Sequence, residues 1–299
     1  MKQEILNDVN RRHDFVILFD VTDGNPNGDP DAGNLPRVDP ETMQGLVTDV
    51  CLKRKVRNYV DQYKGTEERY KIYVEHHGIL NDQHQRAYTA LGIQSKGTKE
   101  SRDTISKARK WMCSNFYDIR LFGAVMTTGV NCGQVRGPVQ LTFARSIDAV
   151  VPLDVSITRV AVTRAEDSGA SEQGESGKQT EMGRKALVPY GLYRGHGFFN
   201  PTLGKDTGMN SEDLALFWKA LQEMWDIDRS ASRGLMALRG LYVFSHESDK
   251  GNAPAHKLFD IISVKRRDGV MAPRSFEDYE VIIREGEVPA GVVLTRVVG

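Results

Sequence analysis

The sequence has few cysteines and no long apolar run. Cys51, Cys113 and Cys132 are odd in number and widely separated, and no two of them have the CxxC spacing of a zinc site or redox motif. A disulfide framework and a zinc centre are therefore not expected. The longest apolar runs, near 150–153 and 261–264, are far shorter than the roughly 20 residues of a membrane helix. We expect a soluble protein that does not enter a membrane.

The chain also lacks net charge, because 40 basic residues balance 40 acidic ones. Overall charge thus gives no support to nucleic-acid binding, which must rest on local patches. The 39% apolar and 27% charged residues are ordinary for a globular protein. With no internal repeat and no linker, residues 1–299 are predicted to form one domain. The N-terminus has neither the apolar stretch nor the cleavage site of a secretory signal, which indicates a cytoplasmic protein.

The pattern of apolar and turn-forming segments predicts an α+β fold with a mixed or antiparallel sheet. Residues 13–21 (HDFVILFDV) are typical of a buried strand, and the next stretch is a long loop rich in Gly, Pro, Asn and Asp. Asp39 is placed to cap a helix that begins at Pro40 and continues over 42–63. Residues 70–80 are predicted to be extended. Further helices are predicted over 98–116 and after a cap at Ser211, and further strands over 120–126, 135–146, 156–163, 187–193, 238–246, 257–266 and 278–284. The polar stretch 164–185 is too long for an ordinary hairpin loop and should project from the body.

Three strings resemble functional motifs and fit poorly. Asp23, Asn25, Asn27 and Gly28 match half of a calcium loop, but Asn34 occupies the position of the bidentate Glu. We therefore predict a turn-rich loop whose side chains bond its own backbone, and no bound metal or cofactor.

The other two strings are a phosphate loop and an RNA-recognition signature. In GESGKQT, 174–180, Gln179 replaces the Ser or Thr that holds magnesium. RGHGFFNP, 194–201, half matches the RNA-recognition signature, yet Phe198 and Phe199 suit a core equally well. His76, His77 and His84 lack a fourth-ligand pattern and are expected to be ordinary surface or hydrogen-bonded histidines.

A basic cluster on the predicted helix is more informative. At 100° per residue, Lys53, Arg54 and Arg57 fall together on one face, while an apolar arc forms on another. That arc consists of Leu52, Val56, Tyr59, Val60 and Tyr63. A solvated cationic face is the plain alternative. However, the helix follows the Gly/Asn loop and Arg37, so loop amides and cations are able to converge on one phosphate track.

These strings together resemble one family. FDVTDGNPNGDPDAGNLPRVDPETMQGLVTDVCLKRKVRNY, FGAVMTTG, GQVRGPVQLTFARSID, YGLYRGHGFFNP and GNAPAHKLFD are similar to the backbone subunit of type I-C CRISPR Cascade surveillance complexes. The resemblance covers essentially the whole chain. It implies an RRM-like (ferredoxin-like) palm, an inserted helical region at about 64–117 and a long β-hairpin thumb at about 156–195.

The function that the resemblance implies is coating of a CRISPR RNA by head-to-tail copies of the chain, which form a helical filament. Exposed guide bases would pair with a target DNA strand in antiviral defence. The implied partners are the guide-processing end-cap subunit, the large subunit and the small subunit, with a helicase-nuclease recruited only indirectly. The chain itself is not expected to be an enzyme.

The resemblance also implies RNA-contacting residues. Lys53 is the strongest candidate, and Asn25, Asn27, Arg37, Thr48, Arg54, Arg57, Gln134 and Arg136 accompany it. In the thumb, the candidates for wedging and holding the RNA are Thr180, Met182, Arg184 and Lys185. Phosphate contacts and an apolar wedge suit this role because every guide has a different sequence.

Two alternative functions stay open. Related type III subunits cut RNA with a loop aspartate and a divalent metal, and Asp23, Asp29 or Asp31 could take that role here. A generic single-stranded RNA-binding protein is the other alternative, and it predicts monomeric binding.

Overall fold

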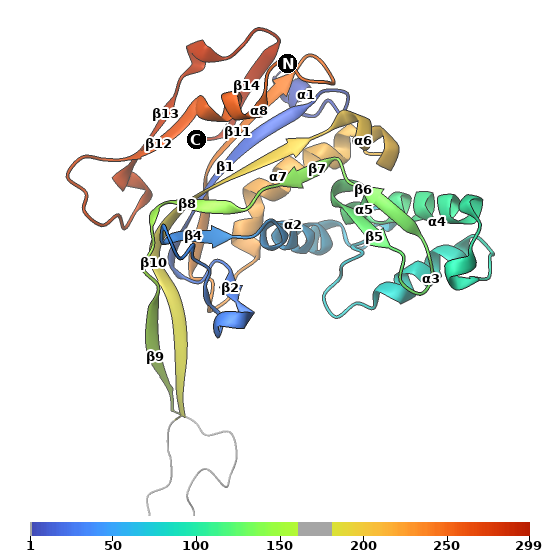
Figure 1. The fold of residues 1–299 in the computed structure, drawn as a ribbon, viewed down its shortest axis with the longest axis horizontal. Helices are drawn as coiled ribbons and strands as arrows, with labels where there is room; N and C mark the ends of the chain where they lie inside the picture. Colours follow the sequence, from blue (N-terminus) through green and yellow to red (C-terminus); the bar gives the residue numbers. More distant parts are fainter. Residues whose placement is uncertain (1, 161–180) are drawn as a thin grey trace, which may run out of the picture.

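A central antiparallel sheet organises the chain, which the computed structural model describes over residues 2–160 and 181–299 (Figure 1). The strand order is β14 (Val292–Val298), β11 (Leu235–His246), β1 (His13–Gly24), β10 (Glu181–Phe199), β8 (Ala144–Ala149) and β4 (Gln44–Val47), and β7 (Val139–Leu141) and β9 (Leu153–Arg159) also pair with β10. Every one of these pairs is antiparallel. The predicted α+β fold is confirmed.

Strand β1 is the centre of the sheet. It pairs with β10 on one edge and β11 on the other, and nearly all of its residues are buried. This is why the middle of the strand, residues 15–19, is continuously apolar and does not alternate. The strand predicted over 13–21 is confirmed. Gly197 of β10 lies opposite Phe15, and a Cβ at that position would come within 2.0 Å of the Phe15 ring. The glycine therefore makes room for a core aromatic.

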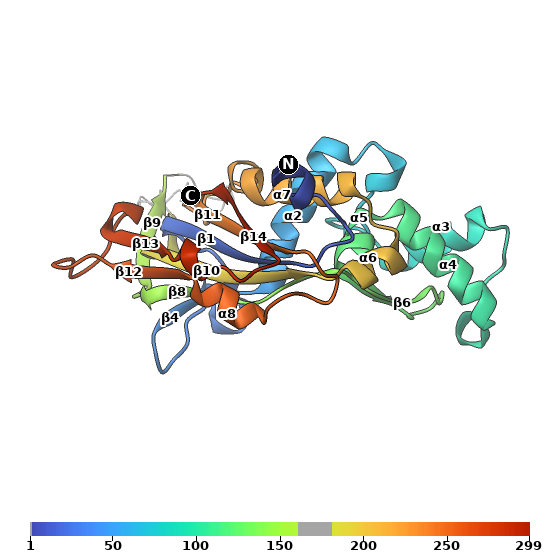
Figure 2. The same cartoon turned by 90° about the horizontal axis from the view of Figure 1, so that it is seen from above.

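Layers cover both faces of the sheet, as Figure 2 shows from above. Helices α2 (Asp49–Lys64) and α7 (Ser211–Ile227) cover one face, where Phe15, Phe19, Val56 and Trp218 belong to one core cluster. Helix α8 (Ala255–Asp260) and the strand pair β12 (Ile262–Arg266) and β13 (Tyr279–Ile283) cover the other face. The remaining small elements are α1 (Lys2–Leu6), α6 (Pro201–Thr207), β2 (Gly28–Asp29) and β3 (Leu35–Pro36).

A helical insertion follows α2 and has a core of its own. It contains α3 (Leu80–Ala90), α4 (Arg102–Asn115), α5 (Tyr117–Phe122) and the hairpin of β5 (Gly123–Met126) and β6 (Gly133–Arg136). Tyr88, Met112 and Phe116 are buried in its core cluster. The buried Arg120 of α5 joins the insertion to α7, because its guanidinium donates two hydrogen bonds, of 3.0 and 2.8 Å, to the Asp213 carboxylate.

A two-stranded ribbon projects from the opposite end of the molecule from this insertion (Figure 1). The first half of β10 pairs with β9, from Glu181 opposite Arg159 to Leu187 opposite Leu153, and the second half of β10 belongs to the central sheet. One continuous strand therefore joins the ribbon to the sheet. The 164–185 prediction falls largely outside the described residues, as does the GESGKQT string.

The predicted start of the long helix is wrong. Thr48, not Asp39, caps α2, and residues 44–47 form β4. Asp39 does accept hydrogen bonds from the amides of Glu41 and Thr42, but they form a turn before a strand. An Asx turn has the same sequence pattern as a helix cap, and pairing of β4 with β8 decides between them.

Five other predictions need correction. Residues 120–122 end helix α5, so only 123–126 of the predicted strand is a strand. Asn210, one residue before Ser211, caps α7. Residues 70–80 form no strand beyond one isolated bridge at Lys71, and 257–260 belong to α8. Tyr63 of the predicted apolar arc is 57% exposed, whereas the other four residues are buried.

Candidate nucleic-acid interface

The Gly/Asn loop is fastened to the start of α2. The Asn27 side-chain oxygen accepts hydrogen bonds of 2.9 Å from both the amide and the hydroxyl of Thr48. The Thr48 hydroxyl in turn accepts from the Cys51 amide, as a helix cap does. The Asn27 and Thr48 side chains thus hold the loop against the helix. These two RNA-contact candidates therefore have a structural role in the protein itself.

Several polar side chains of the loop bond within the loop itself. The Asp29 carboxylate accepts from the Asp31 amide and forms an ion pair of 3.3 Å with Arg37. The buried Asn25 side chain donates to the Asn34 carbonyl oxygen at 2.7 Å. This is the predicted turn-rich loop. Over the described ranges, no group of three or more His, Cys, Asp or Glu side chains is arranged to hold a metal ion.

The predicted cations of α2 each have an internal partner. The Lys53 ammonium lies 2.9 Å from the Asp49 carboxylate, and the Arg57 Nε lies 2.7 Å from Asp118. Arg54 donates to the Val74 carbonyl oxygen at 2.7 Å. Burial, and then the charge of Arg57, lower the pKa of Arg54. All three remain partly exposed, so the cationic face exists. It is oriented by Asp49, Asp118 and the Val74 carbonyl, which the sequence analysis did not identify.

An aromatic ring brings two of these cations together. The Lys53 Nζ lies 5.5 Å and the Arg57 Cζ 5.3 Å from the centroid of the Phe122 ring, within the range of a cation–π contact. Phe122 also lines a hollow of about 400 Å³ beside β5 and β6, together with Arg136. Arg136 and Gln134 are exposed on β6, so the Arg136 candidate lies next to the α2 candidates.

The two faces of the ribbon differ in chemistry. Leu153, Val155 and Ile157 alternate along β9 and are each between 41% and 50% exposed. Directly opposite residues of paired strands share a face, so Lys185 lies with this apolar set, opposite Val155. Arg184 and the 77% exposed Met182 lie on the other face. The thumb candidates are thus divided between faces, and Thr180 lies outside the described residues.

A second hollow, of about 410 Å³, brings the loop and the ribbon together. Asn25 and Asn34 of the loop line it with Arg184 and Lys185 of β10. Arg184 is 3.4 Å from Asp154 with both side chains well exposed, so this pair holds the guanidinium only loosely. Two cations therefore border a hollow at the root of the ribbon, which sequence spacing alone did not reveal.

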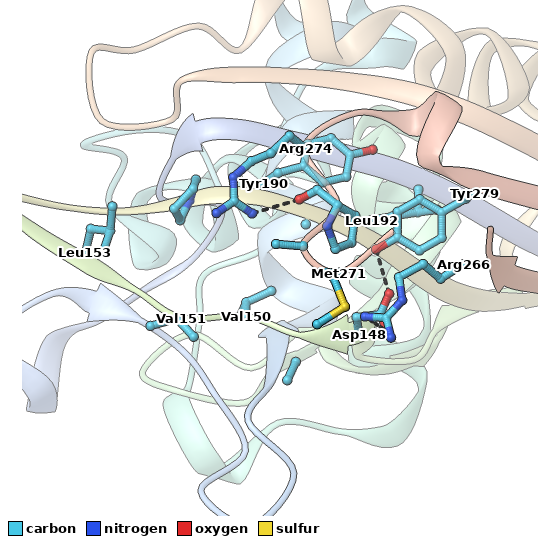
Figure 3. Close-up of a pocket in the computed structure, with 15 residues that line it drawn as sticks. Asp148, Val150, Val151, Leu153, Tyr190, Leu192, Arg266, Met271, Arg274 and Tyr279 are labelled. Atoms are coloured by element: carbon cyan, nitrogen blue, oxygen red, sulfur yellow. Dashed lines mark hydrogen bonds and ion pairs between the residues drawn. The ribbon is translucent and has the colours of Figure 1, made fainter. Parts of the chain in front are cut away.

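A third hollow lies on the other face of the sheet and contains none of the candidate residues. It has a volume of about 480 Å³ and is lined by β8, β10 and the 267–275 loop, as Figure 3 shows. At its edge the Tyr279 hydroxyl donates to Asp148 at 2.9 Å, and Arg266 lies 3.5 Å from the same carboxylate. Met271 is 91% exposed at the loop tip.

The half-matched RNA signature belongs to the core. Phe199 is buried, and Phe198 packs on Phe259 with ring centroids 5.7 Å apart. His196 stacks on the same ring at 4.5 Å, and burial lowers the pKa of His196 to about 4.

His84 is buried and hydrogen-bonded to the Tyr73 hydroxyl. None of the helices within the described ranges has the length and apolar character required to cross a membrane.

Comparison with known proteins gives one consistent result. A sequence model described as CRISPR-associated protein Cas7 matches residues 11–284. A Haloferax volcanii protein named CRISPR-associated protein Cas7 is 24% identical over 300 residues, which cover 92% of this chain and 81% of the relative. One solved structure, described as "CRISPR RNA-guided surveillance complex, pre-nicking", contains a chain with a TM-score of 0.53 and 15% identity, over 81% of this chain and 79% of that one. At this identity the structural likeness establishes the fold alone.

Proposed function

The chain belongs to the Cas7 family of CRISPR-associated proteins, and on this premise we propose that it binds CRISPR RNA as the repeated backbone subunit of a type I-C surveillance complex. The family match over residues 11–284 carries the proposal, because it includes both α2 and the ribbon of β9 and β10. The sheet with α2 and α7 is the RRM-like palm, the insertion after α2 is the helical region, and the ribbon is the thumb.

The α2 cations suit a ligand whose sequence varies. Lys53 has three N–H donors and Arg57 has five, and each uses one with its internal partner. The remaining donors are available to phosphate oxygens, which carry no base information. A neutral chain is able to bind RNA in this way when its cations are confined to one surface.

Head-to-tail assembly follows from the same proposal. Contacts between different surfaces of identical subunits generate filaments when the rotation does not close. Residues 20–24 of the predicted acidic loop belong to β1, and Asp20 is buried. The part that a neighbouring copy is able to meet is the segment at 28–31, with Asp29 and Asp31. Pairing of exposed guide bases with target DNA, and contact with the large, small and end-cap subunits, complete the proposed role. The protein is cytoplasmic and not an enzyme in this account.

Binding to unrelated RNA sequences tests the proposal. Fluorescence anisotropy with two guides of equal length and different sequence should give equal affinities, and Lys53→Ala/Arg57→Ala should weaken both equally. Lys107→Ala/Lys219→Ala, whose exposed partners are Asp103 and Glu223, serves as the control for the loss of two charges alone. Strong preference for one sequence would contradict the backbone role. Cleavage of complementary target RNA in the presence of magnesium by the wild-type complex, and not by an Asp23, Asp29 or Asp31 variant, would favour the ribonuclease alternative.

A further inference from the structure

The Phe122 side chain has an unusual position for a core residue. It ends α5 and is 6% exposed, yet its ring faces two cations of another helix. Most core aromatics contact other apolar groups, as Phe217 does against this same ring at 6.4 Å. The negative face of an aromatic ring attracts a cation. Burial in the core therefore does not by itself explain why two cations lie over the Phe122 ring.

Like charges at one ring need compensation. Lys53 and Arg57 lie 5.5 and 5.3 Å from the same centroid and repel each other. Asp49 holds Lys53 from its own helix, and Asp118 holds Arg57 from α5. The ring and the two carboxylates together fix both long side chains, which would otherwise lose rotamer freedom when a ligand bound.

We propose that Phe122 is a positioning residue for RNA binding: its ring holds Lys53 and Arg57 in the orientation in which their free donors meet successive phosphates. This inference rests on the proposed function and adds to it a residue that touches no RNA. Loss of the ring would keep both cationic residues but leave their side chains free to change orientation. The affinity for RNA should therefore fall while the net charge of the protein stays the same.

The test compares Phe122→Leu with Phe217→Leu. Both substitutions remove one buried ring, but only Phe122 contacts the cations, whereas Phe217 is fully buried in the same cluster. Phe122→Leu should weaken binding of a single-stranded guide RNA by about fivefold and reduce the slope of log affinity against log salt by up to about 1.4, since each lost phosphate contact contributes roughly 0.7. Phe122→Tyr, which keeps the ring, should restore both quantities. Equal changes of RNA affinity and salt dependence in Phe122→Leu and Phe217→Leu would show that Phe122 has only a structural role.

A second measurement needs no RNA. Acylation of lysines by acetic anhydride, read by peptide mass spectrometry, should become several-fold faster at Lys53 in Phe122→Leu. Lys64, which is 41% exposed, is the internal reference. If Lys53 reacts at the same rate in Phe122→Leu as in wild type, the inference is overturned, whatever the RNA affinity of the variant. If wild-type protein binds no RNA, the proposed function fails, and the positioning role fails with it.

Discussion

Replacement of Asp118 by Asn should destabilise the protein much more than the same replacement at Asp103. Asp118 is 1% exposed and accepts from the amides of Tyr73 and Val74 and from Arg57. An Asn side chain has one acceptor oxygen in place of two and would turn an N–H group toward the Arg57 guanidinium. Breaking a buried ion pair costs about 3–5 kcal/mol. Because Arg57 is 12% exposed and partly rehydrates, we expect about 3 kcal/mol.

The control has the same ion-pair distance in a different environment. Lys107 and Asp103 are also 2.7 Å apart, but their side chains are 58% and 74% exposed. Such a pair, with its helix N-terminal carboxylate, contributes less than about 1 kcal/mol. At roughly 2 °C per kcal/mol for a chain of this size, thermal unfolding should shift by about 6 °C for Asp118→Asn and by less than about 2 °C for Asp103→Asn. Equal shifts in scanning calorimetry would refute the reasoning from burial.

Three further predictions concern pH, ligand affinity and packing. Burial lowers the pKa of His13 to about 4, below its unfolded value near 6.5, so the stability that neutral His13 contributes is complete above pH 6.5 and is lost as pH falls toward 4. Because the pKa of His196 is lowered in the same way, the effect of His13 is measured as a difference: between pH 7 and pH 5, urea unfolding should show wild type losing about 2 kcal/mol more than His13→Gln, and an equal loss in both proteins would contradict this. In Asp49→Asn the Phe122 ring still holds Lys53, while Lys53 gains a free donor and phosphate no longer meets a carboxylate. RNA affinity should therefore rise about two- to fivefold in anisotropy, at a cost of about 0.5–1 kcal/mol of stability; weaker binding would contradict this. Gly197→Ala should cost about 1–3 kcal/mol by contact with the Phe15 ring, while Gly286→Ala, which has open space, should change the free energy of unfolding by less than about 0.5 kcal/mol.

Local sequence patterns predicted helices and strands well where residues close in sequence determine the secondary structure. The strand at 13–21 has a run of five apolar residues and the helix after 210 has strong helical periodicity, and both exist. The long helix was placed too early because Asp39 and Pro40 have the pattern of a cap, whereas β4 depends on β8, about 100 residues away. The α5 helix at 117–122 was partly taken for strand, since its stability depends on Arg120 reaching Asp213.

The candidate site was predictable only where its residues are close together in the sequence. Helical geometry predicted that Lys53 and Arg57 share a face, and both lie over one ring. Asp49 was detectable, because it stands four residues before Lys53. Asp118 was not, because it lies 61 residues from Arg57. The hollow that brings Asn25 to Arg184 and Lys185 likewise depends on distant segments.

The most direct test of the central claim is native mass spectrometry of the protein co-expressed with CRISPR arrays of two spacer lengths. Wild type should carry several copies per RNA, with more copies on the longer guide, and Lys53→Ala/Arg54→Ala/Arg57→Ala should lose RNA or copies. A monomeric, RNA-free wild type, or a copy number that is independent of guide length, would contradict the account.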